Sequence, residues 1–178
     1  MNTKINCFAI IFCLIIPLLV SAQDKKIDGF LNFKWGTAAS VIKKDMPAKI
    51  SGVRFVKQEK GKIEFEGVTY KGVKVKKWQF EFFENKLCNV EVDYVPANDM
   101  AESRVMLNKI EKAISSEYFK SGSTMRDDGG SYFWIEKNVN EEAEEIISLT
   151  WEFSTPEITL AFTHYPLYKK ILEAEDKK

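Results

Sequence analysis

The sequence is poor in the residues from which catalytic and metal sites are most often built. Its 178 residues include one histidine, His164, and three cysteines. Cys-x-x-Cys, His-Glu-x-x-His and Gly-x-Ser-x-Gly are all absent, so a zinc site, a redox dithiol and an activated serine have no recognisable motif. His164 alternates in phase with apolar residues, which is more typical of a core or rim position than of a base. We therefore expect a protein that is not an enzyme and uses no cofactor or metal.

An excess of charge of either sign is also missing. Lys and Arg together number 26, as do Asp and Glu, for a formal net charge of +0. Such a chain has no long-range field that would steer it onto nucleic acid or an anionic membrane, so we expect no nucleic-acid partner. The glycines of the first half, Gly29, Gly36, Gly61, Gly67 and Gly72, are scattered, and none belongs to a phosphate-binding loop before a helix. A hydrophobic content of 45% instead indicates a packed globular domain.

The N-terminus has the three parts of a secretory signal peptide. Lys4 precedes an apolar run over 8–20, and Val20, Ser21 and Ala22 provide small residues before Gln23. The apolar run is short for a membrane span, although an uncleaved anchor is the alternative. We predict cleavage after residue 22, which leaves 156 of the 178 residues as one domain, 23–178. The protein would then be periplasmic or secreted, with no membrane span after cleavage.

Cysteine becomes scarcer still in the predicted mature chain. Cys7 and Cys13 lie in the signal peptide, so Cys88 alone remains and no internal disulfide can form. A reactive thiol is one interpretation of Cys88. Its alternation with Val90 and Val92 favours a small buried apolar residue instead.

The pattern along the chain predicts an α+β fold. Short turns between alternating runs indicate hairpins, and we expect a curved antiparallel sheet of about seven strands in the order αββββαβββ. Two main helices would cover one face, and the halves 29–96 and 97–166 would each be a helix followed by a meander. The expected helices are 38–46, capped by Thr37 and ended by Pro47, 100–119, and a short one at 167–174. The expected strands are 53–58, 63–70, 73–83, 87–95, 131–136, 146–154 and 158–165.

The opening segment Phe30-Leu31-Asn32-Phe33-Lys34-Trp35-Gly36-Thr37 resembles a turn found in small exported envelope domains. With the tandem helix-plus-sheet order, it resembles the fold of β-lactamase inhibitory protein and its structural relatives. That resemblance implies a binding protein without known activity, but the inhibitor's binding loops have no match here. The small lipoproteins that assist outer-membrane assembly have a similar opening. No cysteine stands directly after the apolar run, where a lipid would be attached, which argues against them.

Alternation along the strands divides the sheet residues between two faces. We expect the core under the helices to comprise Trp78, Phe80, Phe82, Val90, Val92, Leu149, Trp151, Phe153, Leu160 and Phe162, packed against Leu107, Ile110 and Ile114. The opposite face should be polar and open to solvent. Its residues, the candidate binding face, are Gln79, Glu81, Phe83, Asn89, Glu91, Asp93, Thr150, Glu152, Thr159, Thr163 and Tyr165.

These patterns favour a non-catalytic module of the cell envelope that binds a protein or a ligand through its open face. Exposed carboxylates there would select a basic partner, and charge reversal at Glu81 and Glu91 would leave stability nearly unchanged. The loops 120–130 and 138–145 are alternative sites. One alternative function is a hydrolase using Glu81 and Glu91, and another is an envelope assembly factor. The acidic residues Glu141, Glu142, Glu144 and Glu145, with Glu136, are either solvated or a calcium site.

Overall fold

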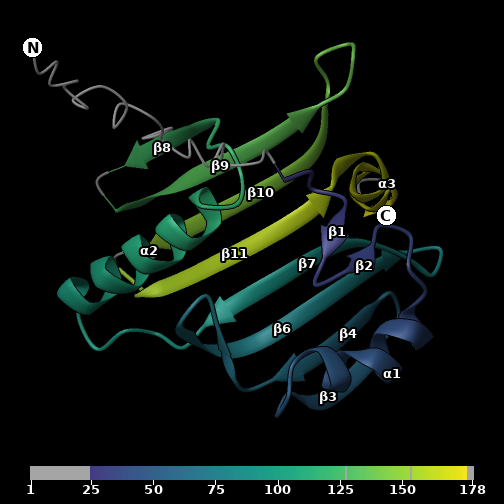
Figure 1. The fold of residues 1–178 in the computed structure, drawn as a ribbon, viewed down its shortest axis with the longest axis horizontal. Coiled ribbons are helices and arrows are strands. Elements are labelled where there is room, and N and C mark those ends of the chain that lie inside the picture. Colours follow the sequence, from purple (N-terminus) through teal and green to yellow (C-terminus); the bar gives the residue numbers. More distant parts are fainter. Residues whose placement is uncertain (1–24, 127, 153, 176–178) are drawn as a thin grey trace, which may run out of the picture.

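The computed structural model describes residues 25–126, 128–152 and 154–175. The predicted signal peptide and Phe153 of the predicted core lie outside these residues. The described chain contains three helices and a large antiparallel sheet (Figure 1). The elements are β1 (Gly29–Phe30), β2 (Phe33–Lys34), α1 (Ala39–Lys49), β3 (Arg54–Glu59), β4 (Lys62–Glu66), β5 (Thr69–Tyr70), β6 (Val73–Phe83), β7 (Lys86–Tyr94), α2 (Met100–Ser115), β8 (Gly122–Arg126), β9 (Gly129–Lys137), β10 (Ala143–Glu152), β11 (Glu157–His164) and α3 (Tyr165–Glu175).

The main sheet has the strand order β3-β4-β6-β7-β11-β10-β9-β8, with β5 pairing beside it on β6. The sheet is open, with β3 and β8 at its two edges, and every pairing within it is antiparallel. Strands β7 and β11 join the two halves of the chain, from Asn89 opposite Thr163 to Asp93 opposite Thr159. The predicted α+β class is confirmed.

Several strands differ from the sequence prediction, and the short strands β1 and β2 were not among the expected ones. Strand β8 lies within the expected loop 120–130. All five of its residues are exposed, so its sequence has no buried side to reveal a strand. The predicted strand 63–70 is broken into β4 and β5 at Gly67 and Val68, whose φ angles are +90° and +62°. Left-handed residues cannot continue a ladder, so the chain turns there. The expected seven strands were therefore too few.

Helices α1 and α2 and the β1–β2 hairpin lie across one face of the sheet (Figure 1). Ile42 and Met46 of α1 are fully buried, and Phe30 of β1 packs its ring 4.9 Å from that of Phe162. Every predicted core residue within the described chain is buried. These residues are Trp78, Phe80, Phe82, Val90, Val92, Leu149, Trp151, Leu160 and Phe162 from the sheet, and Leu107, Ile110 and Ile114 from α2.

The third helix is where the predicted layer arrangement fails. Helix α3 follows β11 without a loop, so Tyr165 begins a helix instead of ending the strand. Its residue Tyr168 lies near Glu81 and Glu91, which point away from the core. Helix α3 therefore covers part of the face that was expected to be open, and the sheet has helices on both sides.

The ends of α1 and α2 also differ from expectation. Pro47 lies inside α1, which continues to Lys49, and Ala38 occupies the N-cap position without a side-chain cap. The first amide of α1, Ala39 N–H, donates to Asn85 Oδ1 at 3.1 Å, so the β6–β7 turn caps this helix. Helix α2 has Asp99 as its N-cap, whose side chain accepts from Glu102 N–H, and it ends at Ser115 instead of at residue 119. No helix of the described residues has both the length and the apolar character to cross a bilayer.

Candidate binding site under helix α3

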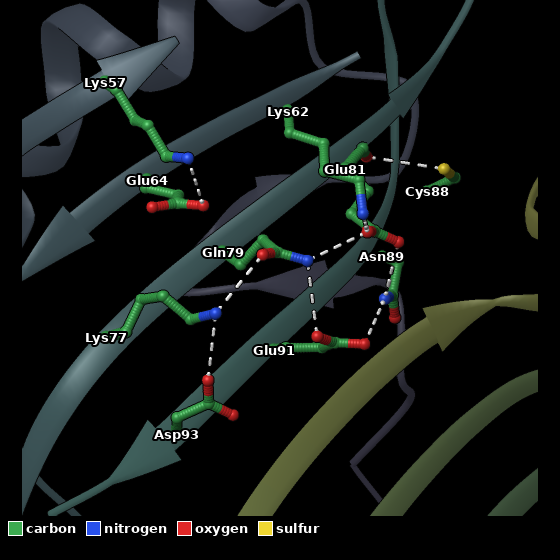
Figure 2. A network of polar contacts seen from close by, with 10 residues as sticks. All are labelled: Lys57, Lys62, Glu64, Lys77, Gln79, Glu81, Cys88, Asn89, Glu91 and Asp93. Atoms are coloured by element: carbon green, nitrogen blue, oxygen red, sulfur yellow. Dashed lines mark hydrogen bonds and ion pairs between the residues drawn. The ribbon is translucent and has the colours of Figure 1, made fainter. Parts of the chain in front are cut away.

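Strand pairing brings the central residues of the candidate binding face together. Gln79 lies opposite Glu91 and Glu81 lies opposite Asn89 across β6 and β7. Residues that are paired directly point to the same side of a sheet. The four side chains therefore form a compact square on the face opposite α1 and α2 (Figure 2).

Within this square, two carboxamides bridge two carboxylates. Gln79 Nε2 donates to Glu81 Oε1 at 2.9 Å and to Glu91 Oε2 at 3.4 Å. Asn89 Nδ2 donates to Glu81 Oε2 at 3.1 Å and to Glu91 Oε1 at 3.3 Å. The result is a closed ring of hydrogen bonds, which we call the amide–carboxylate ring (Figure 2). Amide donors offset part of the repulsion between two neighbouring carboxylates.

Three of the four ring residues are buried and Glu91 is half-buried, which corrects the expectation of a solvated face at the ring. Gln79, Glu81 and Asn89 are 8%, 5% and 2% exposed. Charge reversal at Glu81 would place a cation among buried polar groups, so it would cost stability instead of leaving it unchanged. The polar pattern predicted correctly which residues share a face, but it carried no information about the helix that covers them.

Lysines from neighbouring strand positions complete the network. Lys62 Nζ lies 2.5 Å from Glu81 Oε1, and Lys77 Nζ lies 3.2 Å from Asp93 Oδ2. Asp93 also accepts a hydrogen bond from Thr159 Oγ1 at 2.9 Å, and Thr163 Oγ1 donates to Asn89 Oδ1 at 2.8 Å. Sequence reasoning missed both lysines. The register signal was available for Lys62, because it lies opposite Glu81 on β4.

Glu91 is the carboxylate of the network that lacks a cation. It takes part in none of the ion pairs found among the described residues. Burial raises the pKa of Glu91, and the nearby charges of Glu81 and Asp93 raise it further. Glu81, in contrast, is neutralised by Lys62. The ring therefore holds two carboxylates in different electrostatic environments.

A hollow of about 590 Å³ lies beside the ring, between α3 and the ends of β4 and β6. Glu81 contributes to its lining, so the buried network opens into this space. The remaining lining residues come from the β3–β4 turn and the start of β4, from the end of β6 and the β6–β7 turn, and from α3. They are Lys60, Gly61, Lys62, Phe82, Phe83, Glu84, Asn85, Tyr168, Ile171, Ala174 and Glu175. A hollow of this size, with apolar walls and a few polar groups, is typical of a small-ligand site.

Four residues of the predicted binding face lie apart from the ring. Thr150 bonds with Ser131 near the β8 edge, and Glu152 accepts from Thr155 at the end of β10. Phe83 lines the hollow, with Lys170 Nζ 5.7 Å from its ring centroid. Tyr165 begins α3. The structure thus concentrates the candidate site on β6, β7 and the adjoining part of β11.

Cys88 is a free, fully buried thiol, as expected. Burial raises its pKa to about 11, so it is a thiol and not a thiolate at neutral pH. This position is unsuited to nucleophilic chemistry.

His164 lies at the rim of the core, where its Nδ1 is 2.8 Å from Glu145 Oε1. Trp35 stacks on the imidazole at a ring distance of 6.0 Å. Glu145 belongs to β10 and not to a solvated connection, and its burial raises the pKa of its carboxyl. In the described residues, no three His, Cys, Asp or Glu side chains gather in a way that could hold a metal ion. Of the acidic segment, Glu145 thus has a structural role, because it lies within β10 and its carboxylate contacts His164.

Comparison with known proteins assigns no family to this chain. No protein family and no curated protein sequence matches this chain. One solved structure, the Bacillus megaterium YpeB C-terminal domain, is distantly similar, with 12% identity and a TM-score of 0.37. The match covers 76% of this chain and 66% of that one, just under two thirds of its length. Similarity at this level assigns neither a family nor a function.

Proposed function

We propose that this protein is a non-catalytic binding module of the cell envelope, with its ligand site in the hollow between α3 and the sheet. The hollow itself is the observation that carries this proposal, because a preformed space meets a buried, fixed carboxylate there. Sites that bind small groups are commonly concave and largely preformed. A sheet with helices on both sides supplies the rigid support.

Two features support a binding role over catalysis. The carboxylate oxygens of the ring are already engaged by the two amides, which fix their orientation. The tandem order, with α1 before β3–β7 and α2 before β8–β11, also fits the proposed resemblance to β-lactamase inhibitory protein. An envelope assembly factor would be a binding module of the same kind.

A tryptophan placed in the hollow tests the proposed site. Ala174→Trp fills the space from α3, whereas Ala101→Trp adds the same side chain at an exposed position of α2. In pull-downs from envelope extract, Ala174→Trp should lose the partner captured by the wild type, and Ala101→Trp should keep it. Full capture by Ala174→Trp would move the site elsewhere, first to the loops 120–130 or 138–145.

Export is tested by intact-mass measurement of protein isolated from the envelope fraction. The proposed signal peptide predicts a mass corresponding to a chain that starts at Gln23. A mass that includes Met1 would contradict cleavage and would favour the anchor alternative.

A hydrolase is the second candidate, and one observation favours it. Glu91 and Glu81 are neighbouring carboxyls whose environments differ, since burial raises the pKa of Glu91 while Lys62 pairs with Glu81. Acid and base pairs in hydrolases differ in this way. A hydrolase would lose turnover in Glu91→Gln with its ligand still bound, whereas a binding module has no turnover to lose.

A further inference from the structure

The hollow under α3 has an apolar wall and a carboxylate floor. Phe83, Tyr168, Ile171 and Ala174 provide aromatic and aliphatic surface, and Glu81 provides the buried anionic group. An apolar wall binds a hydrocarbon group, and a desolvated carboxylate binds a cation. The two features together describe a ligand with a cationic head on an apolar body.

Glu81 has three donors, and they are not equivalent. Gln79 and Asn89 are themselves buried and belong to the amide–carboxylate ring, so they fix the orientation of the carboxylate. Lys62 arrives from the outer side on β4, and its side chain is 48% exposed. Of the three donors, Lys62 is the one that can leave without breaking the ring. An incoming ammonium would replace one ammonium with another, so Glu81 would not be left as an unpaired buried charge.

The charges around the hollow also favour a cation. Its lining contains three carboxylates, Glu81, Glu84 and Glu175, against the two lysines Lys60 and Lys62. Glu91 shares both amide donors with Glu81, and it has no ion pair among the described residues. The lining and the ring together therefore have an excess of negative charge.

We propose that the hollow binds a primary alkylammonium group, with the ammonium on Glu81 in place of Lys62 Nζ and the alkyl chain against Phe83 and Ile171. This inference rests on the proposed binding site and adds the chemistry of its ligand. Lys62 then acts as a resident competitor, which occupies the cation position when the hollow is empty.

Three probes of similar length and different head groups test the inference. Titration of ¹⁵N-labelled protein with n-hexylammonium should shift the amide signals of residues 60–62 and 81–85. Hexanoate and 1-hexanol should shift them much less, because neither head group carries a positive charge that could replace the ammonium of Lys62 beside Glu81. Nα-acetyl-lysine amide carries the same ammonium on a peptide, and comparing it with hexylammonium distinguishes a free amine from a lysine side chain.

Two substitutions should change hexylammonium affinity in opposite directions. Glu81→Gln should weaken binding about tenfold, the size expected for a lost hydrogen bond to a charged group. Lys62→Met should tighten binding several-fold, because it removes the competitor. The control for the lysine is Lys57→Met, since Lys57 is equally exposed at 46%, pairs with Glu64 and lies outside the hollow. The control for the glutamate is Glu152→Gln on the same sheet face; neither control should change affinity.

The outcomes separate this inference from the proposed site. If 1-hexanol binds as tightly as hexylammonium, the hollow is a ligand site but ammonium recognition is wrong. Preferential binding of hexanoate would also overturn the inference, with the sign of the charge reversed. If no probe binds, the ammonium inference is wrong, and the Ala174→Trp pull-down decides separately whether the hollow is a binding site. Should Glu81→Gln not fold, Lys62→Met still decides, because unchanged or weakened binding in that variant contradicts the displacement of Lys62.

Discussion

On strand β6, Trp78 and Phe80 point toward α1 and α2, whereas Gln79 and Glu81 point toward α3. All four are buried, so the two faces of this strand differ in chemistry and not in exposure. The first face is held by apolar contacts, such as the ring of Phe80, 5.7 Å from that of Phe65. The second is held by hydrogen bonds and an ion pair. Alternation in a strand therefore indicates which residues share a face, but only the elements packed on that face decide whether it is exposed to solvent.

The helix-side face is expected to be the more sensitive of the two. Trp151→Ala removes a large, buried side chain from β10, 4.9 Å from the ring of Tyr132. The free energy of unfolding should fall by about 3–5 kcal/mol, as in other large truncations of a core. Urea denaturation measures this change. A loss below about 1 kcal/mol would mean that this face is not the main core.

The polar face should tolerate truncation better, but not freely. Asn89→Ala removes a donor from each of Glu81 and Glu91 and the acceptor of Thr163. We expect a loss of about 1–3 kcal/mol, the cost of leaving buried polar groups without partners. Thr150→Ala, near the β8 edge of the same face, is the control and should cost much less. Equal, small losses for the two variants would show that the ring contributes little to stability.

The smallest expected effect is a pH dependence from Glu91. Because burial raises its pKa in the folded protein, the folded state holds this proton more tightly than the unfolded state does. The contribution of Glu91 to stability is therefore fully present below its unfolded pKa and is lost as the pH rises through the folded pKa. The Glu91→Gln variant has no charge to gain at this position. The Tm of this variant minus the Tm of the wild type should therefore increase as the pH is raised from about 4 to about 7.

Thermal melts across this pH range test the prediction, with Glu152→Gln as the exposed control. A difference between Glu91→Gln and the wild type that stays constant with pH would contradict it. The same melts also bear on the hydrolase alternative, because both ideas depend on an unusual environment for Glu91.

Strong periodicity explains what the sequence could predict. The apolar spacing of α2, with Leu107, Ile110 and Ile114, and the alternation of β6 identified both the core and the register of the ring. Strand β8 was missed because an exposed edge strand has no buried side to alternate against. Turns posed a different problem at Val68, because a left-handed valine is rare and the local sequence gave no sign of it.

The position of α3 could not be predicted for a physical reason. None of its residues is fully buried, so the pattern of apolar residues in its sequence indicates only weakly which surface the helix contacts. The hollow and the role of Lys62 both depend on where this helix lies. Predicting the candidate site therefore required tertiary packing, while predicting the polar face required only the period of a strand.

The β6–β7 turn connects the two sides of the sheet through one carboxamide. Glu84 and Asn85 are both left-handed, with φ of 48° and 64°, which turns the chain tightly at the rim. Asn85 lines the hollow, and its Oδ1 accepts from Ala39 N–H at the start of α1 on the opposite side. A ligand that draws this carboxamide toward itself would withdraw the acceptor from Ala39 and loosen the first turn of α1. The amide signal of Ala39 would then report such a ligand from the opposite side of the sheet.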